Sequence, residues 1–417
     1  MTTASAPRRL RARTVAIDDP GDLLDYLSEA SDVAWIRRGD GMVGLGVAES
    51  AEVADVETGA AWWAAIAGHL EHSSDLPGAW GVGPAAFGSF AFDPYRTRCR
   101  SIMVVPRLII GRRGGVSWLT AVDEAPVGAA AVPAPAEPAE APGSVEVTPV
   151  GKDADAWAAT VAELVATIND PSAGLGKVVL ARALRVRAER AVHARWLAAR
   201  LASAYPNCWT FHVGGLVGAS PEMLIRVEGG LATSRVLAGT IRRSDPSQDE
   251  ALAEALAGSG KDLEEHRFAV ESVASALRPF CSGMNVPDAP FVLQLPNVLH
   301  LASDVTGVMK RSDSSLHLAA ALHPSAAVCG TPTAQALATI GRLEGLDRGR
   351  YAGPVGWIDA TGDGEWAIAL RCGQLDPSDA RAITLYAGCG IVGRSRPEAE
   401  VAETEAKFRP MLDALGA

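Results

Sequence analysis

Three charged residues near the end of the chain have the spacing of one helix face. Glu400, Glu403 and Lys407 lie at positions i, i+3 and i+7, and they follow a glycine-rich run. Two carboxylates one helical turn apart repel each other unless a cation lies between them. A divalent metal that bridges these carboxylates to an acidic ligand is one interpretation. A charged helix face in contact with solvent is the other, and this segment alone favours neither.

The elements that must position these residues are a strand and a glycine loop. Apolar and polar residues alternate over 383–387, which is typical of a strand. Gly388, Gly390 and Gly393 follow, and we expect them to turn the backbone and expose its N–H groups.

A helix should follow this loop. Ser395 and Glu398 have the spacing of a capping box, with Pro397 in the first turn. The loop and the helix N-terminus together predict an anion site. The glycines also match the G-x-G-x-x-G dinucleotide motif, which requires a further strand and an acidic residue about 20 positions on. Only one helix is expected before Ala417, so we reject the nucleotide interpretation.

The composition is that of an ordinary soluble globular protein. Of 417 residues, 48% are hydrophobic and 21% are charged, and the net charge of −11 argues against a nucleic-acid partner. No apolar run approaches the roughly 18 residues of a membrane span, and the N-terminus lacks the apolar part of a signal peptide. The six cysteines are scattered, which favours reduced thiols in a cytoplasmic protein over a zinc site or disulfides.

The chain divides at an Ala/Pro-rich segment. Residues 1–124 form an N-terminal portion that begins with a loose tail over 1–20, and residues 125–149 form a mobile linker or surface loop. Residues 150–417 form the C-terminal portion, and both portions could share one core. The spacing predicts a helix over 60–70 and an amphipathic helix over 154–168.

Four further residues stand out within the predicted elements of the C-terminal portion. Lys177 opens a strand over 175–189, and Glu222 follows a proline that fixes its turn. His300 lies in an apolar run, and Arg371 ends the hairpin predicted over 351–372. Taken singly, each residue is better explained as a solvent-facing, paired or satisfied core residue than as part of a site. Strands with hairpin turns between long helices, one of them over 247–280, predict a mixed α/β (α+β) protein with largely antiparallel sheets.

In order along the chain, ten motifs resemble one family. They are GKVVLAR, GASPE, LAGT, KDLEEH, LHLAS, LHPSAAVCGTP, YAGPVGW, ALRC, YAGCGIVGRSRPEAE and ETEAK. They are similar to those of the chorismate-utilising enzymes, which include isochorismate synthase, salicylate synthase and anthranilate synthase component I. The resemblance is dense over about 150–410, and AFGSFAFDP extends it thinly into the N-terminal portion. It implies two large, mostly antiparallel sheets packed face to face with helices outside.

The resemblance also implies a Mg²⁺-dependent site for chorismate. Its metal ligands would be Glu265 and Glu403, with Glu400 assisting. Lys177 would be the general base that activates water, and Glu222 the general acid that protonates the leaving hydroxyl. The residues implied in substrate binding are Ala238, Gly239, Thr240, His300, Arg371, Tyr386, Gly388, Gly390 and Lys407.

The branch of the family is read from two positions. Ala238 stands where a relative can carry a nucleophilic lysine, which leaves room for water and makes a glutaminase subunit unnecessary. The Leu322–Ser325 motif resembles isochorismate and salicylate enzymes. We expect an isomerase, isochorismate synthase, that acts in menaquinone or siderophore biosynthesis as a monomer or weak homodimer. Cys389 and Thr331 depart from the usual pattern and keep salicylate synthase as an alternative; anthranilate synthase component I and a non-catalytic chorismate-binding protein are others.

Overall fold

The computed structural model describes residues 9–28, 31–125, 128, 130–243, 246–294, 298–310 and 313–417. The side chains of six of these residues lie outside the description: Thr240, Arg242, Pro246, Lys261, Glu265 and Val298. Within the described residues, no helix is both long enough and apolar enough to cross a bilayer. All six cysteines are free, as the scattered spacing predicts.

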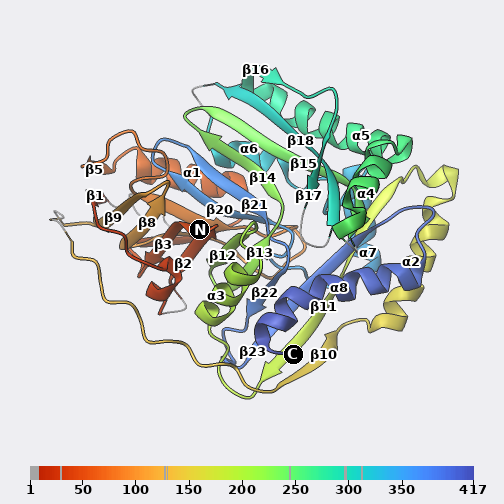
Figure 1. Ribbon diagram of the computed structural model, residues 1–417, viewed down its shortest axis with the longest axis horizontal. Helices are drawn as coiled ribbons and strands as arrows, with labels where there is room; N and C mark the ends of the chain where they lie inside the picture. The colour runs from red at the N-terminus through yellow and green to blue at the C-terminus, as the bar shows by residue number, and fades with distance from the viewer. Residues whose placement is uncertain are drawn as a thin grey trace.

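Two large sheets form the centre of the molecule (Figure 1). The 13-stranded sheet has the order β10 (Val145–Val150), β11 (Lys177–Ala188), β23 (Ala382–Ile391), β22 (Cys372–Leu375), β13 (Leu216–Ser220), β12 (Trp209–Val213), β2 (Val33–Arg37), β3 (Asp40–Leu45), β8 (Leu108–Arg113), β9 (Val116–Asp123), β1 (Arg11–Ala16) and β5 (Glu71–Ser74), with β19 (Gly330–Thr331) on β11. The 10-stranded sheet has the order β16 (Cys281–Asn285), β18 (Val298–Met309), β15 (Leu231–Arg242), β14 (Met223–Glu228), β21 (Gly364–Ile368), β20 (Pro354–Asp359), β6 (Ala85–Ser89), β7 (Ser101–Val105) and β4 (Glu49–Val53), with β17 (Phe291–Gln294) on β18. Strands β1 and β5 pair in parallel, and the other described pairings are antiparallel.

The sheets pack face to face because their strands alternate apolar residues toward a shared core. Trp35 and Phe211 of the larger sheet meet Phe87 and Trp357 of the smaller one, all fully buried. In each sheet a block of strands from the C-terminal portion pairs with a block from the N-terminal portion, through β12 and β2 in the larger sheet and β20 and β6 in the smaller one, so residues 1–124 and 150–417 share this core. The predicted α+β architecture of two antiparallel sheets is confirmed.

Helices cover the outer faces of both sheets. They are α1 (Val56–Ala67), α2 (Ala154–Ile168), α3 (Ala194–Ala204), α4 (Asp249–Ala257), α5 (Gly260–Leu277), α6 (Ser315–Leu322), α7 (Thr333–Leu343) and α8 (Pro397–Leu415), with short 3-10 turns at Leu23–Tyr26, Pro171–Ala173, Pro246–Gln248 and Arg278–Phe280. Figure 1 shows α4 and α5 beside β15 and β18, and α2 beside α8. On the outer face of the larger sheet, Leu197 and Leu201 of α3 join Phe408 and Met411 of α8 in a second core.

Several predicted elements are corrected. The N-terminal tail is not loose throughout, because Arg11–Ala16 forms β1 between β9 and β5. The helix expected over 60–70 is α1, Val56–Ala67, which begins at a capping box of Asp55 and Thr58. The helix expected over 247–280 is two helices, because Ser259 caps a new one: its side chain accepts a hydrogen bond from the N–H of Asp262.

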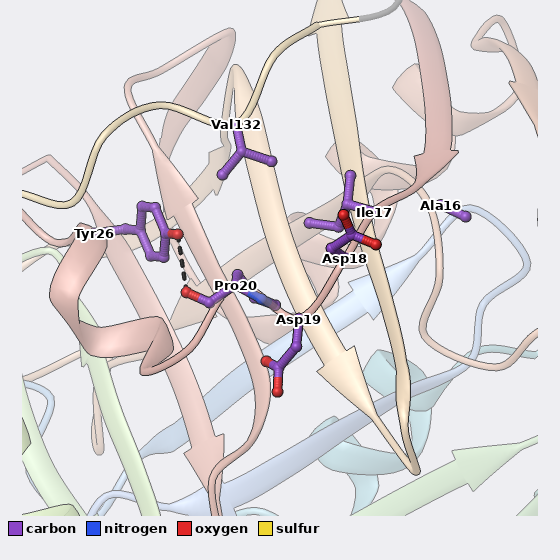
Figure 2. A pocket seen from close by; sticks show the side chains of 7 residues that line it. All are labelled: Ala16, Ile17, Asp18, Asp19, Pro20, Tyr26 and Val132. Atoms are coloured by element: carbon purple, nitrogen blue, oxygen red, sulfur yellow. Dashed lines mark hydrogen bonds between the residues drawn. The ribbon is translucent and has the colours of Figure 1, made fainter.

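The Ala/Pro-rich segment is attached to the surface along its described part. Ala136 N–H donates to the Asp25 carbonyl at 2.8 Å, and Arg195 donates to the carbonyls of Ala136 and Glu137 at 2.9 and 2.6 Å. Val132 packs against the second core, and Figure 2 shows it facing Tyr26. These contacts argue against the mobility that the composition predicts.

Candidate active site

Lys177 begins β11 and lies against β23. Its Cα is paired with Thr331 of β19, and the next residue is paired with Ile391 of β23. The Lys177 side chain passes directly over Gly390, where an added Cβ would lie 2.7 Å from Lys177 Cε. Gly390 is therefore required for this placement of the amine, because only hydrogen fits in that space.

A buried ion pair supports the same part of β11. Arg348 and Glu344 are 3% and 1% exposed, and their side chains meet at 2.6 Å. Glu344 accepts a hydrogen bond from the Ala181 N–H at 2.7 Å, and Arg348 donates to the Val179 carbonyl at 2.8 Å. The two side chains thus form hydrogen bonds with backbone groups of β11 that lie beyond the end of the short strand β19. The sequence analysis missed both residues, and their i, i+4 spacing was the only available signal.

Glu222 lies where the chain crosses from one sheet to the other. It connects β13 of the larger sheet to β14 of the smaller one, after Pro221. Its N–H donates to Ser220 Oγ at 3.2 Å, and its carbonyl accepts from the Ile368 N–H at 3.1 Å. The rigid turn that the proline predicts is thus supported by two backbone hydrogen bonds.

The Glu222 carboxyl group is surrounded by three cations. Burial raises its pKa, and the charges of Lys177, Lys407 and Arg371 act in the opposite direction. Burial is the larger effect, so the pKa of Glu222 lies above its ordinary value. A carboxyl group with a raised pKa can hold a proton that an ordinary glutamate has lost, as a general acid must.

Arg371 lies at the second crossing between the sheets, from β21 to β22. Its φ of 49° places a non-glycine residue in the left-handed region, and its carbonyl accepts from the Ala219 N–H at 3.2 Å. Such strained conformations occur often at functional sites because surrounding structure must hold them. Both crossings deliver their charged side chains, Glu222 and Arg371, to one place.

His300 of β18 faces the same group of charges. Its pKa is lowered to about 4, mainly by burial and also by the Arg371 and Lys407 charges, while a hydrogen bond to the Gly239 backbone acts in the opposite direction. The imidazole is therefore neutral at pH 7. The structure thus brings His300 close to the predicted cationic residues, beside Gly239.

The Ala238-Gly239-Thr240 segment is a bulge in β15. The register against β18 shifts between Leu237 and Thr240, and Gly239 has a φ of 80°. His266 of α5 fastens the bulge: its Nδ1 lies 3.2 Å from the Ala238 carbonyl, and its Nε2 lies 2.8 Å from Ser303 Oγ. The Thr240 side chain lies outside the described part. His266 was not predicted, although it belongs to the KDLEEH motif.

Of the three glycines predicted to form a loop before α8, only Gly393 lies in a turn. Gly388 and Gly390 are strand residues of β23, paired with Ala181 and Val179 of β11. The Gly388 carbonyl accepts from Lys407 Nζ at 2.8 Å, so this residue turns its backbone polar groups away from β11. Strand β22 pairs with β23 only as far as Tyr386, which leaves the glycine edge of β23 beyond the end of β22.

The predicted capping box is also wrong. The N-cap of α8 is Arg396, without a side-chain hydrogen bond, and Ser395 Oγ accepts instead from the Val392 N–H at 3.1 Å. Pro397 is the first helical residue, as predicted. The chain therefore leaves the strand through a turn at Ser395, and Glu398 takes no part in a cap.

Tyr386 is stacked on a second tyrosine that was not predicted. Its ring lies 5.2 Å from that of Tyr351, at an interplanar angle of 11°. Burial raises the pKa of both phenols, so both are neutral donors at pH 7. A Cβ at Gly388 would lie 3.2 Å from the Tyr351 hydroxyl, which places that hydroxyl beside the glycine edge.

The candidate metal ligands lie on α8 and α5. Glu400 and Glu403 are half-buried, and Glu403 accepts a hydrogen bond from Lys407 at 2.6 Å. The Glu265 side chain lies outside the described part, and the described residues contain no group of three acidic, histidine or cysteine residues placed to hold a metal. Carboxylate oxygens suit Mg²⁺, so the two half-buried carboxylates of α8 fit a hard divalent cation, which would compete with Lys407 for Glu403.

A surface hollow lies apart from this group of residues. It has a volume of about 650 Å³ and lies under the Ala/Pro-rich segment, lined by Asp18, Asp19, Tyr26 and Val132 among others (Figure 2). Asp19 is already paired with Arg112 at 2.7 Å. We place the candidate site at the convergence of Lys177, Glu222, His300, Arg371 and Lys407, because charge and burial coincide there.

Comparisons with known proteins identify the family of the chain. The family model for chorismate binding enzymes matches residues 19–416. The chain belongs to this family. Membership extends over both chain portions, including the N-terminal one in which the motifs are sparse, and the resemblance seen in the motifs is confirmed.

Among relatives of this chorismate binding enzyme, isochorismate synthase DhbC of Bacillus subtilis is 42% identical over 255 residues, 58% of this chain and 63% of that protein. Isochorismate synthase MenF of Bacillus subtilis is 32% identical over 372 residues, 83% of this chain and 76% of that protein. The solved structure of MenF, the menaquinone-specific isochorismate synthase from Escherichia coli, is 25% identical with a TM-score of 0.78, covering 98% of this chain and 95% of that one.

Proposed function

We propose that this chain is an isochorismate synthase, an isomerase that converts chorismate to isochorismate with Mg²⁺. One observation carries the proposal: a glutamic acid with a raised pKa, Glu222, lies within the influence of Lys177, Lys407 and Arg371. The reaction requires an acid, a base and cations for a substrate with two carboxylates. The relatives' names support the same reaction.

In the proposed reaction, Lys177 takes a proton from water as the water oxygen bonds to C2 of the ring. Glu222 gives a proton to the C4 hydroxyl as its bond to carbon breaks and the ring double bonds shift. One water enters and one leaves, so substrate and product have the same atoms. Each proton transfer of this kind is worth about 10²–10⁴-fold in rate.

The remaining residues bind and orient the substrate in this proposal. Arg371 and Lys407 are the cations for its carboxylates, and the N–H groups of Gly388 and Gly390 lie at the strand edge beside Lys407. Mg²⁺, held by Glu403 and Glu265 with Glu400 assisting, would neutralise one carboxylate and strengthen its binding. Lys407, which donates to Glu403 at 2.6 Å, would add a second cation for the substrate carboxylates.

Water is the proposed nucleophile, so no glutaminase partner is needed. The bulge at Ala238 carries a methyl group and therefore no side-chain nucleophile. Salicylate synthase, which goes on to eliminate pyruvate, requires the same groups. Cys389, one of the two residues that keep this alternative, lies on β23 between Gly388 and Gly390. Pyruvate release therefore separates the two activities.

The test is to incubate the purified protein with chorismate and Mg²⁺ and to separate the products by chromatography. Isochorismate without pyruvate supports the proposal, whereas salicylate with pyruvate moves the activity one step further. If anthranilate forms only when ammonia is supplied, ammonia and not water is the nucleophile. Bound but unchanged chorismate would make the chain a binding protein.

Two matched pairs of variants test the residue roles. Lys177→Ala should abolish turnover and retain chorismate binding. The control is Lys310→Ala, at an exposed lysine that donates to the Pro279 carbonyl, and it should retain both turnover and binding. Glu403→Ala should abolish Mg²⁺ activation, whereas Glu405→Ala, on the exposed side of α8, should retain it. Full activity of Lys177→Ala, or unchanged Mg²⁺ activation of Glu403→Ala, would remove that residue from the mechanism.

A further inference from the structure

A buried arginine connects β11 to the helix that carries the candidate metal ligands. Arg182 is 7% exposed and lies on β11 beneath α8, with its Nη1 2.9 Å from Thr404 Oγ1. Its guanidinium carbon lies 5.7 Å from the Trp157 ring of α2, and the Trp157 indole donates to the neighbouring Ala181 carbonyl at 3.1 Å. Figure 1 shows α2 and α8 side by side over β11.

The hydroxyl group of Thr404 is held in one orientation. Thr404 is fully buried, and its Oγ1 donates to the Val401 carbonyl at 2.7 Å. That bond uses the only hydroxyl hydrogen, so the oxygen can only accept from Arg182. A hydrogen bond with fixed donor and acceptor roles and a charged donor is stronger and more directional than a neutral one.

The position of Thr404 on the helix makes this bond relevant to the site. With 3.6 residues per turn, Thr404 lies about 40° around the helix from Glu400 and about 100° from Glu403. Any rotation of α8 about its axis therefore moves Thr404 and both carboxylates together. Strand β23 holds the helix on the same side through Lys407, which donates to the Gly388 carbonyl at 2.8 Å.

Stability alone does not account for an arginine here. Among the described residues, the buried Nε of Arg182 has no hydrogen-bond partner, and the guanidinium forms no ion pair with a carboxylate. Burial lowers its pKa, with the more distant Glu405 charge opposing that effect. An apolar residue of similar volume would remove a buried, incompletely paired charge, and such replacements are often neutral or stabilising.

We propose that Arg182 is a positioning residue: through Thr404 it fixes the rotation of α8, and thereby the direction in which Glu400 and Glu403 point. This inference rests on the proposed function, because it gives those two carboxylates the role of holding Mg²⁺. Side chains that orient metal ligands from outside typically change metal affinity 10–100-fold when they are removed.

The experiment uses Thr404→Val and Thr404→Ser as a matched pair in the full chain. Valine keeps the shape and loses the hydroxyl, whereas serine keeps the hydroxyl and loses a methyl group. Mg²⁺ is titrated into each protein and binding is followed by calorimetry, alongside melting temperature and the Mg²⁺ dependence of turnover. We expect Thr404→Val to weaken Mg²⁺ binding roughly tenfold and Thr404→Ser to stay within about twofold of wild type.

Arg182→Met and Arg182→Lys test the other side of the bond. Methionine should weaken Mg²⁺ binding like Thr404→Val, and the double variant should be no weaker than the weaker single one, because both remove the same bond. Lysine should restore part of the affinity. If Arg182→Met does not fold, the Thr404 pair decides.

The outcomes separate this inference from the proposed function. If wild type binds Mg²⁺ and converts chorismate, but Thr404→Val keeps wild-type Mg²⁺ affinity with only a lower melting temperature, the positioning role is overturned and the function stands. If wild type neither binds Mg²⁺ nor converts chorismate, the proposed function fails, and the inference fails with it.

Discussion

Gly390→Ala should lower the turnover rate without unfolding the protein. The new Cβ would lie 2.7 Å from Lys177 Cε, and ordinary contact begins at 3.4 Å. The end of the lysine side chain must therefore retreat by about 0.7 Å or more, because atoms at that separation repel steeply. Gly390 has no left-handed φ, so the alanine backbone itself is unstrained.

The size of the effect follows from this displacement. A misplacement of about 1 Å can cost about 10²-fold in rate, so we expect kcat to fall roughly 10–100-fold. That corresponds to about 1.4–2.7 kcal/mol in the activation free energy. The free energy of unfolding should change by less than about 1 kcal/mol, since alanine is favoured over glycine in a strand and the lysine end is flexible.

The assay is the initial rate of isochorismate formation over a range of chorismate concentrations, with the melting temperature measured in parallel. Gly283→Ala in β16 is the matched control, because an added Cβ there meets nothing within 4 Å. Gly388→Ala is the contrast: its Cβ would lie 2.8 Å from the Leu180 backbone oxygen, which cannot retreat cheaply, so it should lose stability. A Gly390→Ala variant with wild-type kcat would refute the proposed role of the Lys177 position.

Three other outcomes follow from the burial of charged groups. Glu222→Gln should lose at least about 10²-fold in kcat/KM, and wild-type kcat/KM should fall as pH rises through the raised pKa of Glu222; a wild-type rate in the variant would remove the acid. Glu344→Gln should cost about 3–5 kcal/mol in denaturant unfolding because it leaves Arg348 buried without its carboxylate, and a loss under about 1 kcal/mol would contradict this. Burial lowers the pKa of His212 from 6.5 to about 4, so its stability contribution is present above pH 6.5 and is lost as the pH falls toward 4. We expect a loss of roughly 2 kcal/mol between pH 7 and pH 5 from this group, and His212→Leu should show a shallower dependence in urea unfolding.

The elements that the sequence predicts well are those whose local pattern agrees with their tertiary environment. Helix α2 begins and ends at the predicted residues, because one apolar face packs on the sheet and Asp153 caps its start. Strand β11 lies within the predicted 175–189, and the hairpin of β20 and β21 is also confirmed. In each case local preference and packing favour the same conformation.

The glycines of β23 were wrongly predicted because their conformation is decided by distant partners. Gly388 and Gly390 have weak strand preference, and three glycines within six residues normally indicate a loop. Here β11 runs beside them as an antiparallel partner strand, with Ala181 opposite Gly388 and Val179 opposite Gly390, and the Lys177 side chain fills the space above Gly390. Glycine is kept in this strand for the close approach of other groups, which no local pattern reveals.

The candidate site divides in the same way. Residues within recognisable motifs, such as Lys177 and Glu222, could be predicted from the order of the motifs along the chain. The groups that hold them in place could not, because a side chain that bonds to a distant backbone carries no local signal. Arg348 reaches the Val179 carbonyl across 169 positions, and Arg182 reaches Thr404 across 222. Both arginines act on β11, the strand that opens with Lys177, so this strand joins the proposed base to the helix of the proposed metal ligands.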